Sequence, residues 1–352
     1  MRLSRIIVTV AVALVLSVAL SACSHGPSSA PAPGSPATPQ AKPELKPASD
    51  SWPKTLKIGS SAPGGYWFTI AAALSEIINQ ELKGVTATPT SGGQVTNVKN
   101  CNSGDYQIAL GCNYTEYDAF VGREPFESKM TNVRSIGNLY PSQWHIITAK
   151  SANINSVPDL KGHPFSPGTK GMGGEVIAQR VLQEYGMSYN DLGKMNLTSY
   201  DDAALLMKDK HIHAMFIQML APSAPFVDVG TFMPIRVISV GADKMDAICQ
   251  KYKMFPGVIP KGTYPGQEED VVCPCGTNEV IVNKNLPEDM VYEITKAMWK
   301  NADKIRKVST GLAPYVKIED ALKGLGLPLH KGAYKYYVEA GIKVPDELKP
   351  ID

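Results

Sequence analysis

Short runs of alternating apolar residues and longer apolar runs at helical spacing follow one another along most of this chain. In the first unit, residues 55–60 alternate around Leu56 and Ile58, which predicts a strand. Apolar residues at helical spacing from Ile70 to Leu82 predict the helix that follows. The same reasoning predicts further strands at residues 85–89, 106–111, 133–140, 145–149, 164–166, 195–199, 211–217, 235–240 and 279–282. It predicts helices at residues 201–209, 222–231 and 242–253, and one long helix at residues 286–305.

This alternation of strands and helices predicts an α/β fold with mainly parallel sheets, in which ligand sites lie at the C-terminal ends of strands. Three glycine-rich turns stand at such positions, at residues 60–69, 90–93 and 166–174. Glycine allows a ligand to approach the backbone closely, because no side chain intervenes. The start of a helix adds free N–H groups and the positive end of a dipole, which suit an anion.

Any one of these turns alone fits an ordinary connection between a strand and a helix, whereas three in one chain favour a binding cleft. No nucleotide-binding pattern accompanies them, neither GxxxxGK[ST] nor GxGxxG in a βαβ unit. We therefore expect backbone groups on two sides of a cleft to hold a small organic anion. The expected contacts are Gly64, Gly65, Ser91, Gly92 and Gly93 on one side, and Thr169, Gly171, Gly173 and Gly174 on the other.

Side chains near these turns are further candidates. Asn97 follows the second turn by one helical turn, and we expect it to reach the ligand. Tyr66 and Trp67 either wall the cleft or pack as ordinary core residues. Lys170 either pairs with a second acidic group of the ligand or is simply solvated.

The N-terminus has the pattern of an export signal. A basic start with Arg2 and Arg5 precedes an apolar run at residues 6–20, too short for a membrane span. The run ends in Leu20-Ser21-Ala22-Cys23, which resembles a bacterial lipobox, so residues 1–22 are expected to be removed and Cys23 lipidated. An ordinary signal peptide with a chance cysteine is the alternative.

The segment that follows predicts a tether. Residues 23–53 consist largely of Pro, Ala, Ser and Lys and contain too few large apolar residues to offset the entropy of ordering. A lipid anchor, a tether and then a folded body describe a protein held at a bacterial membrane, periplasmic or on the cell surface. No later apolar run approaches membrane length, so the membrane contact expected is the anchor alone.

Charge and cysteine content exclude several classes of function. Without residues 1–22, the 35 basic residues become 33, which equals the 33 acidic ones and argues against nucleic acid as a partner. Export allows disulfides, so a bridge from Cys249 to Cys273 or Cys275 is one interpretation. The interpretation we favour is that the cysteines are buried free thiols. Cys101 and Cys112 complete the set of cysteines after Cys23.

An enzyme is not expected. The histidines are scattered, and no G-x-S-x-G or H-E-x-x-H pattern occurs, so neither a nucleophile nor a metal centre is indicated. A cysteine-dependent hydrolase is the weak alternative, because it would need a thiolate beside a base. No cofactor or metal is expected.

A set of stretches in a fixed order resembles the TAXI-type solute-binding components of tripartite ATP-independent periplasmic (TRAP) transporters. The resemblance covers nearly all of residues 54–343. The most distinctive stretch is the Tyr-Pro-Gly loop at residues 261–267. The other stretches are residues 56–59 with 64–66, 91–97, 139–141, 159–162, 285–292 and 328–333.

The resemblance implies a fold like that of type II periplasmic binding proteins, with two α/β lobes joined by two crossover strands and a cleft between them. It implies one lobe at residues 54–144 plus 276–352 and the other at residues 145–275. It implies capture of an amino acid such as glutamate, or of a dicarboxylate or 2-oxo acid, and delivery to a TRAP membrane permease. A lipid-anchored sensor that feeds a signalling receptor is the alternative, since fold alone does not separate the two.

The resemblance also implies positions for cleft residues. Asn113 and Tyr114, after the strand that ends at Gly111, lie where the cleft residues of the family are found. Gln218 differs from the small residue that is more usual there, and we expect it to line the second lobe's side of the cleft. The stretch at residues 273–276 contains Pro274 and Gly276, which weaken a strand, so the returning crossover is expected to differ from the family's.

Overall fold

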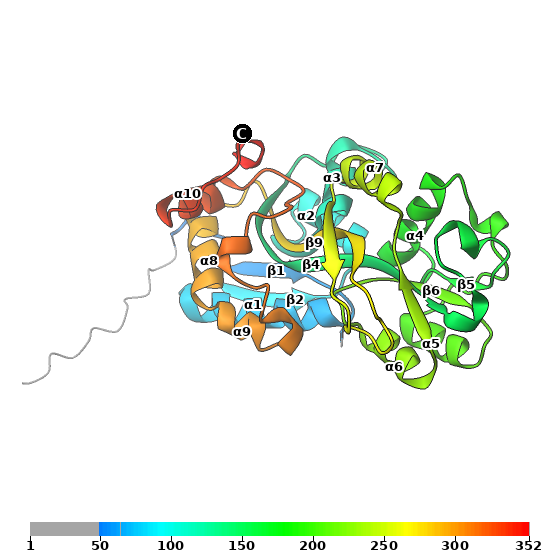
Figure 1. The fold of residues 1–352 in the computed structure, drawn as a ribbon. Coiled ribbons are helices and arrows are strands. Elements are labelled where there is room, and N and C mark those ends of the chain that lie inside the picture. Colours follow the sequence, from blue (N-terminus) through cyan, green and yellow to red (C-terminus); the bar gives the residue numbers. More distant parts are fainter. Residues whose placement is uncertain (1–48, 64, 352) are drawn as a thin grey trace, which may run out of the picture. The chain divides into compact units, whose positions relative to one another are not determined.

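The computed structural model describes residues 49–63 and 65–351 (Figure 1). The predictions of a signal peptide, of lipidation at Cys23, of the tether as far as residue 48 and of a ligand contact at Gly64 therefore lie outside the described residues. Within the described part, no helix combines the length and apolar character needed to cross a membrane.

A single mixed sheet runs through the described residues. Its strands are β1 Thr55–Gly59, β2 Thr86–Thr90, β3 Ile108–Cys112, β4 Val133–Ala149, β5 Phe165–Ser166, β6 Ala214–Met219, β7 Ile235–Ile238, β8 Phe255–Ile259 and β9 Val271–Asn283. The strand order is β2-β1-β3-β9-β4-β6-β5, with β7 paired to β4 and β8 paired to β9.

Helices cover this sheet on both halves (Figure 1). They are α1 Tyr66–Glu81, α2 Gln94–Ser103, α3 Asn113–Val121, α4 Gly173–Glu184, α5 Tyr200–Lys208, α6 Ala224–Phe232, α7 Ala242–Tyr252, α8 Glu288–Lys300, α9 Ala302–Arg306 and α10 Lys331–Glu339. Short 3₁₀ helices lie at Lys150–Ala152, Pro158–Leu160, Tyr189–Asp191, Thr310–Leu312, Ile318–Asp320 and Asp346–Leu348.

Two long strands connect the halves of the sheet. β4 pairs with β9 from Val133 to Gln143 and then with β6 from Gln143 to Thr148. On its side away from β4, β9 pairs with β8 from Val271 to Cys275 and then with β3 from Asn278 to Val282. The predicted α/β fold, in which two α/β halves share two crossover strands, is therefore confirmed.

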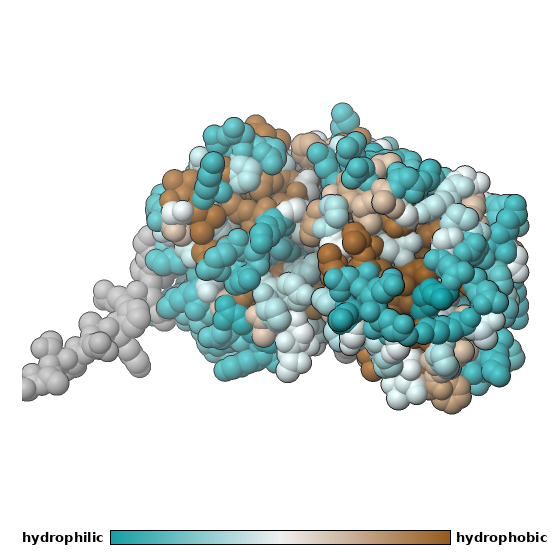
Figure 2. Space-filling view, viewed as in Figure 1, coloured by the Kyte–Doolittle hydropathy of each residue, from teal (hydrophilic) through white to brown (hydrophobic). Residues whose placement is uncertain are grey.

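Each half has its own apolar core. Leu56, Ile70 and Ile294 belong to a cluster that draws only on residues 52–140 and 280–348, which we call the first half. Phe165 and Phe216 belong to a cluster drawn from residues 144–254, to which Cys112 and Tyr114 are added, and a further cluster spans residues 147–275; we call residues 144–275 the second half. The face in Figure 2 is largely hydrophilic, with apolar patches between the polar residues.

Local sequence explains where the helices begin and end. α8 starts after Pro287 and carries Glu288 and Asp289 in its first turn and Lys300 in its last, charges that complement the helix dipole. α2 ends at Gly104, whose φ of 90° lies in the left-handed region that glycine adopts without strain.

Several predictions were wrong in detail. The sheet is mixed rather than mainly parallel, because β4 and β9 run antiparallel to each neighbour with which they pair. The two strands predicted at residues 133–140 and 145–149 are one strand. β9 continues through Pro274, which pairs with Pro256 of the short strand β8. Residues 195–199 form no strand beyond a single bridge from Met195 to Phe165.

The long helix predicted at residues 286–305 is two helices. α8 ends at Asn301, whose φ of −110° and ψ of 24° lie outside the helical region, and α9 begins directly after it. The side chain of Asn301 donates to the carbonyl of Ala297 (2.9 Å) and to Glu81 of α1 (3.0 Å). A polar residue that bonds to the preceding turn therefore ends α8 within an otherwise continuous apolar pattern.

Candidate functional site

The first two glycine turns lie side by side because they follow neighbouring parallel strands. β1 and β2 are paired up to Gly59 and Thr90, and the N–H of Ser60 donates to the carbonyl of Thr90 (2.9 Å). Asn97, fully buried in α2, donates its side-chain amide to the carbonyls of Ser60 (2.9 Å) and Leu110 (2.8 Å). Its Oδ1 accepts the N–H of Gly93 (3.2 Å). Asn97 therefore fixes both turns, and we assign it to that role rather than to the ligand.

The third turn meets the second across the two halves. A Cβ added to Gly173, the first residue of α4, would lie 2.5 Å from Cδ of Gln94, the first residue of α2. The N-termini of α2 and α4 therefore approach each other as closely as a glycine allows. Three turns that are distant in the sequence are thus brought to one place.

Polar side chains from both halves surround this meeting point. The Nε2 amide of Gln94 donates to the Tyr114 hydroxyl (3.1 Å) and to Oε1 of Gln218 (3.2 Å). The Nε2 amide of Gln218 donates to Oγ of Ser142 on β4 (2.7 Å). Tyr200 lies beside them, because its hydroxyl accepts the N–H of Gln218 (3.4 Å). Sγ of Cys112 lies 3.4 Å from Nε2 of Gln94 and 3.8 Å from Nε2 of Gln218. We call Gln94, Cys112, Tyr114, Ser142, Tyr200 and Gln218 the junction cluster.

The junction cluster carries no formal charge. Burial raises the pKa of Tyr200 and that of Cys112 to about 12, and it also raises the pKa of Tyr114. Both tyrosines and the thiol are therefore protonated at physiological pH. A ligand at this place would meet neutral donors and acceptors.

The N-cap residues of α1, α2 and α4 make no capping bond with their own side chains. Two nearby side chains do accept N–H groups at these starts: Oγ of Ser61 accepts the N–H of Phe68 in α1 (3.2 Å), and Oδ1 of Asn97 accepts the N–H of Gly93 at α2 (3.2 Å). The first turns of α1 and α2 also contain no acidic residue, whereas α4 carries Glu175. The other first-turn N–H groups and the positive dipole ends of α1 and α2 are therefore what these starts offer to an anion.

The remaining predicted contacts differ in how close they lie to the junction cluster. A Cβ added to Gly174 would lie 3.2 Å from Cζ of Tyr200, so this residue borders the cluster. Thr169, Lys170 and Gly171 are exposed, and no contact places them against the cluster. Lys170 makes no ion pair with any residue in the described part. The others are Gly65 and Tyr66, which are half-buried, Gly92, which packs against Asn97, and Ser91, which is exposed.

Asn113 is committed to the chain itself. It is fully buried, it donates to the carbonyl of Lys253 (2.6 Å), and its Oδ1 accepts the N–H of Thr277 (3.0 Å). It therefore ties the start of α3 to β9 and α7. Tyr114, the next residue, enters the junction cluster and packs edge-on against Trp144 at 5.4 Å.

Four members of the junction cluster were not predicted from the sequence, namely Gln94, Cys112, Ser142 and Tyr200. Gln94 directly follows Gly93, so its position as the first residue of a helix was the available signal. Ser142 lies in β4 between the two strands that were predicted at residues 133–140 and 145–149. Tyr200 begins α5, and nothing in the local pattern connects it to a glycine turn.

Trp67 links the first turn to the same region. Its indole N–H lies 3.0 Å from Oδ1 of Asn278 and 3.1 Å from the hydroxyl of Tyr140. Asn278 belongs to β9 and Tyr140 to β4, so Trp67 bonds to both crossover strands. It also packs against the apolar cores of both halves. These contacts with both halves favour the prediction that Trp67 walls the cleft over the alternative that it is an ordinary core residue.

The described thiols are poorly suited to nucleophilic chemistry. Cys101, Cys112, Cys249, Cys273 and Cys275 are all free and buried. Burial raises the pKa of Cys249 to about 11, so its thiolate is scarce at neutral pH. A cysteine hydrolase therefore receives no support from these residues.

The distinctive Tyr-Pro-Gly loop has a structural role. Tyr264 is almost fully buried, and its hydroxyl accepts the N–H of Ser223 (3.0 Å). The same hydroxyl lies 2.8 Å from Nε2 of His145 on β4. Burial lowers the pKa of His145 to about 3, so this histidine remains neutral. The loop thus anchors the second half to a crossover strand, away from the junction cluster.

Several solved structures resemble this chain at low identity. The periplasmic aliphatic sulphonate binding protein SsuA from Escherichia coli is 12% identical, with a TM-score of 0.46, and covers 84% of this chain and 91% of its own. PhnD1 from Prochlorococcus marinus, solved with methylphosphonate, is 11% identical at a TM-score of 0.46 and covers 82% and 98%. A structure from work on glutathione import by GshT of Streptococcus mutans is 12% identical at a TM-score of 0.46 and covers 75% and 96%.

Comparison of the sequence with family models shows the family. Residues 58–341 match the family model described as the NMT1-like family. This match includes the three glycine turns, both crossover strands and every member of the junction cluster, and it spans well over half of the chain. The chain therefore belongs to the NMT1-like family.

Proposed function

We propose that this protein is an extracytoplasmic solute-binding protein that captures a small organic anion between its two halves and delivers it to a membrane permease. The observation that carries the proposal is the meeting of Gln94 with Gly173 and Gln218. It joins the N-terminus of a helix in the first half to the start of a helix and the end of a strand in the second. A solute bound here would touch both halves.

The anionic class of the solute follows from the donors around the meeting point. The starts of α1 and α2, whose N-cap residues are the glycines Gly65 and Gly93, supply backbone N–H groups and partial positive charge. The amides of Gln94 and Gln218 supply further neutral donors, while no guanidinium enters the junction cluster. A carboxylate of an amino acid, a 2-oxo acid or a dicarboxylate would therefore be bound by charge-assisted hydrogen bonds to the backbone.

Binding would be coupled to movement of the halves. We propose lobes at residues 54–144 plus 276–352 and at residues 145–275, joined by β4 and β9. A ligand that contacts both lobes favours the arrangement in which they approach each other. In the structure, Gln94 and Gln218 bond to each other, and we propose that the solute takes over part of this contact.

The transporter class rests on the sequence stretches that resemble TAXI-type components of TRAP transporters. The pattern Leu20-Ser21-Ala22-Cys23 supports a lipid anchor on the outer side of a bacterial membrane. The permease partner and the anchor together would hold the binding protein close to its membrane component. A genomic neighbour encoding a TRAP membrane component would favour transport over sensing.

A thermal-shift screen of the full chain tests the proposal. The panel contains amino acids, 2-oxo acids and dicarboxylates, with matched uncharged analogues as controls. A true solute at a hundred times its dissociation constant stabilises the protein by roughly 2.7 kcal/mol. The proposal predicts at least one anion that shifts the unfolding temperature saturably. A panel in which uncharged analogues act as strongly as the anions would contradict it.

A further inference from the structure

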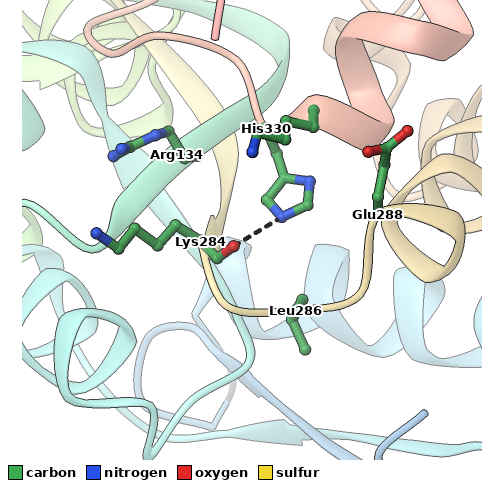
Figure 3. Close-up of a pocket in the computed structure, with 6 residues that line it drawn as sticks. Arg134, Lys284, Leu286, Glu288 and His330 are labelled. Carbon is green, nitrogen blue, oxygen red and sulfur yellow. Dashed lines mark hydrogen bonds between the residues drawn. The ribbon is translucent and has the colours of Figure 1, made fainter. Parts of the chain in front are cut away.

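A basic pocket lies in the first half, at the edge of the sheet where β1, β3 and β4 begin and β9 ends. The first two glycine turns lie at the opposite ends of the strands. It is a cavity of about 250 Å³ lined by Arg134, Lys284, Leu286, Glu288, His330 and Lys331 (Figure 3). We call these six residues the basic pocket. The residues come from the start of β4, the end of β9 and the starts of α8 and α10. The glycine turns instead follow the C-terminal ends of β1 and β2.

Pairing within the sheet places the pocket at this edge. Val282 of β9 pairs with Ile108, the first residue of β3, and Asn283 pairs with Val133, the first residue of β4. β1 is parallel to β3, so it also begins at this edge. The basic pocket is therefore separated from the junction cluster by the length of the strands.

Positive charge predominates in the pocket. Arg134, Lys284 and Lys331 are basic, and Glu288 is the acidic residue among the six. Neither Lys284, which is half-buried, nor Lys331, which is exposed, forms an ion pair with a residue in the described part. Arg134 is buried and is positioned by bonds from Nη1 to the carbonyls of Thr131 (2.9 Å) and Val133 (2.7 Å).

The two helix starts at the pocket are fixed against each other. A Cβ added to Gly332 of α10 would lie 2.6 Å from the backbone nitrogen of Tyr292 in α8, so the helices are in close contact there. The ring of His330 joins them to β9, because Nε2 lies 3.1 Å from the carbonyl of Lys284 and Nδ1 accepts the N–H of Gly332 (3.1 Å). Figure 3 shows the bond between the ring and the Lys284 carbonyl. The two lysines and Arg134 supply formal positive charge to the pocket, and the two helix dipoles add to it.

We propose that the basic pocket binds a phosphate-type anion. Lys284 and Lys331, which form no ion pair within the described residues, border a cavity and are donors of the kind that a phosphate group requires, since lysine binds phosphate as a point charge. The volume is that of roughly eight water molecules in the liquid, which accommodates a phosphate group with part of its hydration.

This anion has two sources with the same chemistry, a free phosphate and the headgroup of a phospholipid. The headgroup source is compatible with the fold, because the chain enters β1 at Thr55, on the same edge of the sheet as the pocket. A membrane-tethered chain, as proposed above, would have phospholipid within reach of this edge. Solute capture at the junction cluster does not depend on the pocket, so the two proposals succeed or fail separately.

Titration of the full chain with inorganic phosphate at constant ionic strength tests the site. The wild type is expected to show a saturable rise in unfolding temperature, and the double variant Lys284→Gln/Lys331→Gln to lose at least tenfold in phosphate affinity. The matched control is Lys83→Gln/Lys99→Gln, which replaces two exposed lysines of the first half that also lack ion pairs in the described part. This control should titrate as the wild type does.

Co-sedimentation with vesicles distinguishes the two sources. Phosphatidylglycerol vesicles are compared with phosphatidylcholine vesicles, and any lipid anchor contributes equally to wild type and variants. A preference for phosphatidylglycerol that the Lys284→Gln/Lys331→Gln variant loses identifies the headgroup. A phosphate response lost in that variant without a vesicle preference identifies free phosphate. Equal behaviour of wild type and double variant in both assays would overturn the proposal.

Discussion

Replacing Gly173 by valine probes whether the two halves must approach at the junction cluster. The new Cβ would lie 2.5 Å from Cδ of Gln94 and 2.8 Å from its Nε2, well inside ordinary van der Waals contact. The Gln94 amide would have to move by about an ångström, which breaks its bonds to Tyr114 and Gln218. Gly173 itself has no positive φ, so the variant is expected to fold.

The magnitude follows from the bonds that are lost. Each net hydrogen bond contributes about 1 kcal/mol, and leaving a buried partner unsatisfied adds to the cost. The arrangement with the halves together should therefore be destabilised by about 2–3 kcal/mol. If the solute binds this arrangement, the destabilisation reduces its binding free energy by the same amount. Its affinity should therefore fall about 30- to 150-fold.

Calorimetric titration of the solute into wild type and Gly173→Val measures this loss, and urea denaturation without solute checks the fold. The same substitution made in a Gln94→Ala background provides the control, because the side chain that obstructs valine is then absent. The effect of Gly173→Val should shrink to less than fivefold there. Unchanged affinity of Gly173→Val, or an equal loss in both backgrounds, would refute the reasoning.

Two further substitutions test the framework of the site. Asn97→Ala leaves the carbonyls of Ser60 and Leu110 without their partner, so urea denaturation should show a loss of about 2–4 kcal/mol; a loss below about 0.5 kcal/mol would contradict the framing role. Burial, and then the charge of Glu279, raises the pKa of Glu116, so the folded state binds this proton more tightly than the unfolded chain does. Stability from this carboxyl should therefore be fully present below pH 4.5 and fall as pH rises toward the folded pKa. Glu116→Gln should remove that fall in urea denaturation between pH 4 and 8, and an identical pH profile would contradict the assignment.

Much of the fold could be predicted from the sequence because its elements are short and strongly patterned. The helix at residues 242–253 was predicted within one residue of α7, whose buried positions Met245, Ile248 and Cys249 recur at helical spacing. The three glycine turns were also located correctly, since each combines a strand, glycines and a helix within a few residues. These signals are local, so a single sequence is enough to recognise them.

The path of the chain between the halves depended on longer-range contacts. Pro141 and Gly276 weaken a strand when considered alone, yet β4 and β9 continue through them because the two strands pair with each other. Tertiary pairing here overrides local preference. The same pairing makes the sheet mixed, which the alternation of strands and helices did not indicate.

The junction cluster illustrates what the sequence could not supply. The glycine turns predicted a place where a ligand meets the backbone, but Ser142 and Tyr200 reach the same place from a crossover strand and a helix start without a local motif. Asn97 lies beside the turns as predicted, and the carbonyls of Ser60, directly after β1, and of Leu110 in β3 accept hydrogen bonds from its amide.

The most direct test of the central claim is amide hydrogen exchange of the full chain with and without saturating solute, once the screen has identified one. If the three turns share one ligand, the backbone amides of residues 61–66, 91–95 and 169–175 should be protected together, with the largest change at the starts of α1, α2 and α4. Protection confined to one turn, or protection that excludes all three, would contradict the claim.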